Sequence, residues 1–110
     1  MADTHSIDHP IDRLFATIQS RKGGDPASSY TAKLFSQGTL KIAKKLGEEG
    51  VETALAAVAQ DKSCLVAESA DLLYHLLVLW SACGVTPEDA YAALEARVGR
   101  SGIEEKKSRG

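Results

Sequence analysis

Two acidic stretches decide the fold of this sequence, and they read Lys41-Ile42-Ala43-Lys44-Lys45-Leu46-Gly47-Glu48-Glu49-Gly50-Val51-Glu52 and Glu68-Ser69-Ala70-Asp71. Glu49 and Glu52 are three residues apart, so their side chains share one face of a helix, and Glu68 and Asp71 repeat this step. The polar segment 60–63 between the two stretches predicts a tight turn at residue 61 or 62. If the two helices fold back antiparallel at this turn, Glu52 and Asp71 lie at the same height.

Carboxylates gathered in this way repel each other, and this costs stability unless a cation or shared protons compensate. A set of oxygen ligands without a nearby cysteine favours a hard ion, Mg²⁺ or alternatively Mn²⁺. The first acidic stretch, with Glu48, Glu49 and Glu52, could equally be the solvated face of an ordinary helix.

The second acidic stretch argues for a metal site. The segment 65–80 is apolar on nearly every side, and Glu68, Asp71 and His75 lie on one stripe of it. Carboxylates on an otherwise buried helix are rarely left unpaired, so these acids are candidate metal ligands. His75 is a candidate for orienting a carboxylate, and a satisfied core histidine is the alternative.

The composition indicates one small soluble domain, because 110 residues are too few for two. A formal net charge of -2 gives no general attraction to nucleic acid or to an anionic membrane. The segment 65–83 is the one candidate membrane span, and its acids make insertion expensive. Cys64 and Cys83 would lie roughly 28 Å apart on one helix, so we expect reduced thiols in a cytoplasmic protein without a targeting segment.

Apolar periodicity predicts an all-α fold of four to five helices. We expect helices over about 7–20, around Leu34 and Phe35, over about 39–59, from the turn to Gly84, and from Thr86 to Gly99. His9 and Asp12 fall on the polar side of the first helix. The third helix has an apolar side with Ala43, Leu46, Val51, Ala54, Leu55 and Val58. Residues 1–99 form the domain, and the charged segment 100–110 is expected to be a disordered tail.

An apolar helix in so short a chain needs cover that its own neighbours supply poorly. The sequence therefore predicts a helical bundle completed by a homodimer or a larger homo-oligomer.

A second polar region precedes the short helix. Ser28 or Ser29 could cap that helix, and its exposed N–H groups, with Arg21 and Lys33 near in sequence, could hold a phosphate. Capping alone explains the serines equally well.

At this point the sequence resembles a known family. The segments Asp25-Pro26-Ala27-Ser28-Ser29-Tyr30-Thr31-Ala32-Lys33-Leu34-Phe35, Lys44-Lys45-Leu46-Gly47-Glu48-Glu49 and Glu68-Ser69-Ala70-Asp71-Leu72-Leu73-Tyr74-His75-Leu76-Leu77-Val78-Leu79 are similar to the phosphoribosyl-ATP pyrophosphatases of histidine biosynthesis. These are all-α nucleotide pyrophosphohydrolases of the MazG type, which share Glu-Glu-x-x-Glu followed by Glu-x-x-Asp. The similarity covers about residues 14–99, and Gly50 departs from it where the family usually has alanine.

The resemblance implies Mg²⁺-dependent hydrolysis of phosphoribosyl-ATP to phosphoribosyl-AMP and pyrophosphate, the second step of histidine biosynthesis. By motif position, the implied metal ligands are Glu49, Glu52, Glu68 and Asp71. Glu48 is implied to be a base that orients water or, alternatively, a residue that supports the ligands from behind, so Glu48 and Glu49 are the catalytic candidates. The candidate substrate-binding residues are Arg21, Ser29, Tyr30, Lys33, Lys41, Lys45 and His75.

Two other functions stay open at the level of sequence. One is a housekeeping pyrophosphohydrolase of the same superfamily that acts on other nucleoside triphosphates. The other is a non-catalytic helical dimerisation module, in which the acidic cluster would hold no metal.

Overall fold

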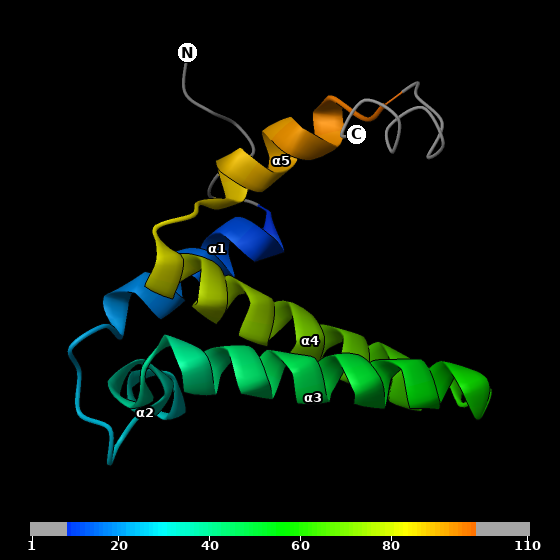
Figure 1. Cartoon of the computed structure of the whole chain (residues 1–110), viewed down its shortest axis with the longest axis horizontal. Coiled ribbons are helices and arrows are strands. Elements are labelled where there is room, and N and C mark those ends of the chain that lie inside the picture. Colours follow the sequence, from blue (N-terminus) through cyan, green and yellow to red (C-terminus); the bar gives the residue numbers. More distant parts are fainter. Residues whose placement is uncertain (1–8, 99–110) are drawn as a thin grey trace.

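The computed structural model describes residues 9–98, and within them the chain forms helices and no strand (Figure 1). The all-α prediction is therefore confirmed. The predicted tail at 100–110 lies outside the described residues. The helices are α1 (Pro10–Ser20), α2 (Tyr30–Gln37), α3 (Thr39–Val58), α4 (Lys62–Cys83) and α5 (Pro87–Glu95).

The helix ends follow from capping residues. Helix α1 begins at Pro10, later than the predicted residue 7, because His9 has an extended backbone and its Nδ1 accepts the Ile11 N–H at 3.1 Å. Helix α5 begins with the predicted cap, since Thr86 and Asp89 accept each other's backbone N–H groups. It ends at Glu95, short of the predicted Gly99, where the chain tightens into turns that bond over three residues.

Helices α3 and α4 form a long antiparallel hairpin that spans the molecule (Figure 1). The turn lies at residues 59–61, so it includes the predicted residue 61, whereas Lys62 already begins α4. Gln60 has a positive φ of 61°, and Asp61 caps α4 by accepting the Cys64 N–H at 3.0 Å. Gly50 lies inside α3, where an added Cβ would meet Leu72 Cδ1 at 3.9 Å, an ordinary contact. Alanine would therefore fit at this position.

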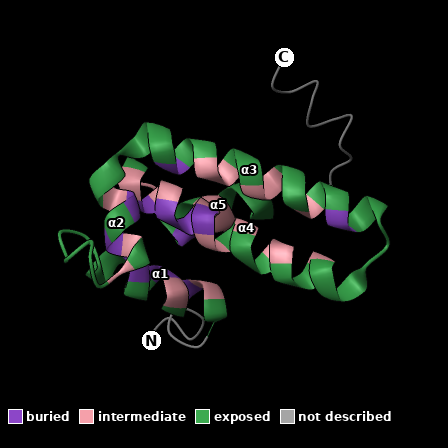
Figure 2. Cartoon of the chain, turned by 90° about the horizontal axis from the view of Figure 1, so that it is seen from below, coloured by how far each residue is buried: buried purple, intermediate pink, exposed green. Residues whose placement is uncertain are grey.

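The core lies at the end of the hairpin that is far from its turn. There α1 and α2 pack against α3 and α4 and bury Phe15, Ile18, Leu34, Ile42, Leu77 and Val78. Figure 2 shows these buried residues gathered where α1, α2 and α4 meet, while the tip of the hairpin is mostly exposed. The radius of gyration is 16.0 Å, against ~13 Å for a typical domain of about 100 residues. The chain is thus an extended hairpin fastened at one end.

Helix α3 turns its acidic side toward α4, as the two acidic stretches predicted, and its apolar side faces away. The small side chain of Ala56 is buried on this side, which lets the two helices approach closely. In contrast, Val51, Leu55 and Val58 are exposed on the apolar side. The apolar stripe of α3 therefore contributes little to the core of a single chain.

Asp12 is buried, although its spacing placed it on the polar side of α1. Helix α5 contacts α1, and the Tyr91 hydroxyl donates to Asp12 Oδ1 at 3.2 Å. Burial, and then the charge of Asp12, raise the pKa of the Tyr91 phenol. A contact between residues 79 positions apart cannot be predicted from local periodicity.

Among the described residues, α4 is long and apolar enough to cross a membrane by length and composition alone. Only 17% of its most apolar window is buried within the chain. However, α3 runs along it, and it carries Glu68, Asp71 and His75, which oppose insertion. The sequence predicts that other helices cover α4 on all sides, and a single chain covers only a small part of it.

A side-chain hydrogen bond joins the two helices of the hairpin in the half nearer the turn. The Thr53 hydroxyl lies 2.8 Å from the Glu49 carbonyl oxygen and 3.1 Å from the Glu68 carbonyl oxygen. The first contact is local to α3, whereas the second crosses to α4. It holds the two backbones together at the height of two acidic residues.

We expect Thr53→Val, which keeps the shape of the side chain, to lower the free energy of unfolding by about 1 kcal/mol, the net value of one hydrogen bond. Urea unfolding monitored by circular dichroism measures this change. Thr39→Val is the matched control, because Thr39 is an exposed threonine at the start of the same helix. Equal stability of the two variants would show that the bond between the helices contributes nothing.

Candidate metal and phosphate site

Three carboxylates from the hairpin meet between α3 and α4. Glu49, Glu68 and Asp71 each offer an oxygen atom, and these atoms all lie within 4.8 Å of one another. The sequence motif thus brings together three of its four proposed ligands. Helix periodicity places Glu68 and Asp71 on one side of α4, and the hairpin turn brings Glu49 to them.

The oxygen atoms of this cluster are poorly satisfied by the protein. Glu49 Oε1 and Glu68 Oε1 are buried and have no hydrogen-bond partner. Buried polar atoms normally have partners, so two unpaired carboxylate oxygens in one cluster require an explanation. A hard divalent cation accepts such an all-oxygen set, and the residues present therefore fit Mg²⁺ or Mn²⁺.

Glu52 borders this cluster through Glu68. Burial raises the pKa of the Glu68 carboxyl above its ordinary 4.5, and the negative charges of Glu52, Glu49 and Asp71 raise it further. Glu52 interacts with Glu68, and the adjacent Thr53 contacts the Glu68 carbonyl. That Glu52 also faces Asp71 stays a prediction. The carboxylates form one continuous acidic surface.

Glu48 lies outside the carboxylate cluster. It is exposed and pairs with Lys45 one turn earlier on α3, with 3.5 Å between Lys45 Nζ and Glu48 Oε1. Such an exposed pair contributes little to stability. Its effect is to connect the acidic surface with the basic residues beside it.

A cavity of about 200 Å³, which we call the lysine cavity, lies where α2 meets the start of α3. Its lining includes three of the predicted phosphate-binding lysines, Lys33, Lys41 and Lys45, together with Tyr30. Gln37 also lines it and was missed by the sequence analysis. Its position, seven residues after Tyr30 and four after Lys33 on one helix, was the signal that could have found it.

Two further predicted substrate-binding residues, Ser29 and Arg21, are placed differently. Ser29 caps α2, and its hydroxyl oxygen accepts the Ala32 N–H at 3.1 Å, which confirms the capping interpretation. Arg21 is the exposed C-cap of α1 and is not among the residues that line the lysine cavity. The structure therefore assembles the lysines but does not bring Arg21 into this cavity.

His75 is buried and does not contact a carboxylate. Its Nδ1 lies 2.8 Å from the backbone oxygen of Asp71, and its Nε2 lies 3.3 Å from the Tyr30 hydroxyl. We expected His75 to orient a carboxylate. Its two ring nitrogens instead contact a main-chain carbonyl and a tyrosine of the lysine cavity.

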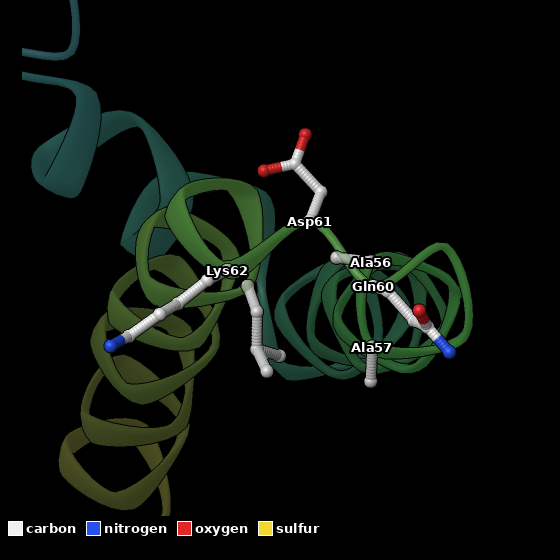
Figure 3. A pocket seen from close by; sticks show the side chains of 6 residues that line it. Ala56, Ala57, Gln60, Asp61 and Lys62 are labelled. Atoms are coloured by element: carbon white, nitrogen blue, oxygen red, sulfur yellow. The ribbon is translucent and has the colours of Figure 1, made fainter.

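A further hollow lies at the tip of the hairpin, beside Ala56, Ala57 and Gln60 (Figure 3). Asp61 borders it, but its carboxylate is used to cap α4 and points away from the hollow (Figure 3). None of the three clustered carboxylates and none of the lysines of the lysine cavity lines this hollow, so we do not assign it to the site.

The raised pKa of Glu68 predicts a specific pH dependence of the metal-free protein. Above this pKa, Glu68 is ionised in both states, and its negative charge is less favourable in the folded protein than in the unfolded chain. As the pH falls through the folded pKa toward 4.5, the folded state takes up its proton first and gains stability.

We therefore expect Glu68→Gln to raise the melting temperature of the metal-free protein near pH 7, and the difference from the parent to shrink as the pH approaches 4.5. Thermal unfolding in a chelator across this range measures the effect. Glu88→Gln, an exposed substitution on α5, is the control. A difference that grows on acidification would contradict the assignment.

The sequence is similar to that of one family of known proteins. The sequence model described as phosphoribosyl-ATP pyrophosphohydrolase matches residues 11–98. A phosphoribosyl-ATP pyrophosphatase of Azospirillum brasilense is 58% identical over 90% of this chain and 89% of its own length. The corresponding proteins of Paramagnetospirillum magneticum and Caulobacter vibrioides are 60% and 61% identical over 90% of this chain, and over 91% and 92% of their own lengths. The chain belongs to the phosphoribosyl-ATP pyrophosphohydrolase family.

Proposed function

We propose that this protein hydrolyses phosphoribosyl-ATP to phosphoribosyl-AMP and pyrophosphate, the second step of histidine biosynthesis. The observation that carries the proposal is the position of the lysine cavity next to a cluster of unsatisfied carboxylates. A substrate with a triphosphate needs cations on both sides of the bond that is cleaved, and this pair of sites can supply them. Membership of the family selects the substrate.

The carboxylate cluster is the proposed Mg²⁺ site, with Mn²⁺ as the alternative. Glu49, Glu68 and Asp71 would hold the ion, and Glu52 completes the acidic surface beside Glu68. When bound, such an ion neutralises phosphate charge and makes water a better nucleophile. The two buried oxygens without partners support this assignment.

The side chains around the cluster bind the phosphates and accept the proton of the attacking water. Lys33, Lys41 and Lys45 bind the phosphate oxygens through charge-assisted hydrogen bonds. Glu48, exposed beside Lys45, orients the water molecule and accepts its proton. The water adds across the α–β phosphoanhydride bond, and pyrophosphate leaves.

Incubation with phosphoribosyl-ATP and, separately, with ordinary nucleoside triphosphates tests the proposal through pyrophosphate release. Release from phosphoribosyl-ATP alone supports it. Release from the ordinary triphosphates instead would favour a housekeeping pyrophosphohydrolase. No release, together with no Mg²⁺ binding by calorimetry, would favour a non-catalytic helical module.

We expect Glu52→Gln to abolish pyrophosphate release and to weaken Mg²⁺ binding, because it removes an anion from the acidic surface. The metal-free variant should be at least as stable as the parent, since the charge of Glu52 is one that disfavours the ionised form of Glu68. Melting temperatures with and without Mg²⁺ and calorimetric titration measure these effects, with Glu88→Gln as the control. A variant that is destabilised without metal yet stays active would make Glu52 a structural residue.

We also propose that the protein is a cytoplasmic homodimer or larger homo-oligomer. The support is the exposed apolar stripe of α3, with Val51, Leu55 and Val58 spaced at i, i+4 and i+7. Apolar grooves also lie between α1, α4 and α5, lined in part by Leu73 and Trp80. A second copy of the chain would cover such surfaces from water.

Light scattering on a sizing column at micromolar concentration should report a mass of at least two chains. Leu55→Lys should shift the protein toward the monomer, because Leu55 is 61% exposed in one chain and a lysine would have to be desolvated in the interface. Ala16→Lys, an exposed position on α1, is the matched control. A parent protein that stays monomeric and stable would contradict the proposal.

A further inference from the structure

We propose that His75 is a positioning residue that acts on the substrate only through Tyr30, by holding this tyrosine as a wall of the lysine cavity. The inference rests on the proposed function of that cavity. It differs from the direct substrate contact that the family resemblance implies for His75. It also differs from a histidine that serves the core alone.

The contacts of the imidazole ring leave it no free nitrogen for a ligand. His75 is only 6% exposed, and both of its nitrogens have protein partners. The Asp71 partner is a backbone carbonyl, which can only accept, so Nδ1 must donate its proton to it. In the neutral ring, Nε2 then carries a lone pair, and the Tyr30 hydroxyl at 3.3 Å donates to it. The carbonyl of α4 thereby fixes the tautomer, and the tautomer fixes the direction of the tyrosine hydroxyl.

The ring stacking around His75 restricts Tyr30 further. The Tyr74 ring meets the His75 ring edge-on, with centroids 4.9 Å apart and planes at 85°. Tyr30 stacks on Tyr74 at 6.2 Å and 26°. The Tyr74 hydroxyl lies 2.5 Å from Thr31 Oγ1. Two neighbouring residues at the start of α2 are thus fastened to two neighbouring residues of α4.

This double attachment matters because of what Tyr30 borders. Tyr30 is 51% exposed although its hydroxyl is engaged, and it lines the cavity with Lys33, one turn further along α2. Asp71, whose carbonyl holds His75, contributes its carboxylate to the acidic cluster. One turn of α4 therefore connects the wall of the lysine cavity with the carboxylates. Loss of this connection should misplace the phosphates and raise KM, with a smaller effect on kcat.

Two substitutions of His75 separate the roles of its nitrogens. Asparagine can place an amide N–H near the position of Nδ1 but does not reach Tyr30, whereas glutamine can place a carbonyl oxygen near the position of Nε2. We expect His75→Asn to raise KM for phosphoribosyl-ATP by about threefold to tenfold, as for the loss of one neutral hydrogen bond. His75→Gln should restore most of this loss.

Tyr30→Phe should raise KM by a similar factor, and the double variant Tyr30→Phe with His75→Asn should be no worse than either single variant. Tyr91→Phe is the matched control: it removes a tyrosine hydroxyl that also joins two helices but lies on α5, away from the lysine cavity. It should leave KM unchanged. Independent, multiplying effects of Tyr30 and His75, or a His75→Asn variant that melts earlier with an unchanged KM, would overturn the proposal.

A measurement without turnover keeps this proposal separate from the proposed function. Nitrogen-15 NMR of the parent's His75 ring should show a protonated Nδ1, and Tyr30→Phe should shift the Nε2 signal. Calorimetric binding of Mg²⁺-pyrophosphate should weaken in His75→Asn and recover in His75→Gln. If the parent released no pyrophosphate from phosphoribosyl-ATP, the proposed function would fail, and the NMR result would still decide the pairing. A protonated Nε2 would refute the role of His75.

Discussion

The electrostatic repulsion among carboxylates held between α3 and α4 is the constraint on which the rest of the structure depends. Glu49, Glu68 and Asp71 come within 4.8 Å of one another although two of their oxygens have no partner in the protein. Packed helices tolerate such an arrangement only where other contacts oppose the repulsion. Thr53 ties the two backbones together beside the cluster, and the buried Ala56 lets the helices approach closely one turn further on.

The lysine cavity and the aromatic residues are arranged around this constraint. Helix α2 brings Lys33 to Lys41 and Lys45 of α3, and the Tyr30–His75 contact fixes the start of α2 against α4. Positive and negative surfaces consequently lie side by side on rigid helices and not on loops. Rigid support of this kind places charged groups more accurately than flexible segments do.

The sequence predicted the features that depend on local chemistry. The caps at Ser29 and Thr86, the turn near residue 61 and the acidic faces of the two long helices follow from spacing and from turn residues. It failed where the outcome depends on packing between distant segments. The burial of Asp12 beside Tyr91, for example, cannot be read from the periodicity of one helix.

The location of the core at one end of the hairpin has a consequence for motion. Buried side chains concentrate where α1, α2 and α4 meet, and the tip of the hairpin has few of them (Figure 2). Backbone amides near the tip should therefore exchange with solvent through small local openings, while those of the core exchange only on global unfolding. The carboxylates lie between these two regimes. Binding of a cation by these carboxylates would extend the rigid region along the hairpin. The site would then become fully ordered only when the cation is bound.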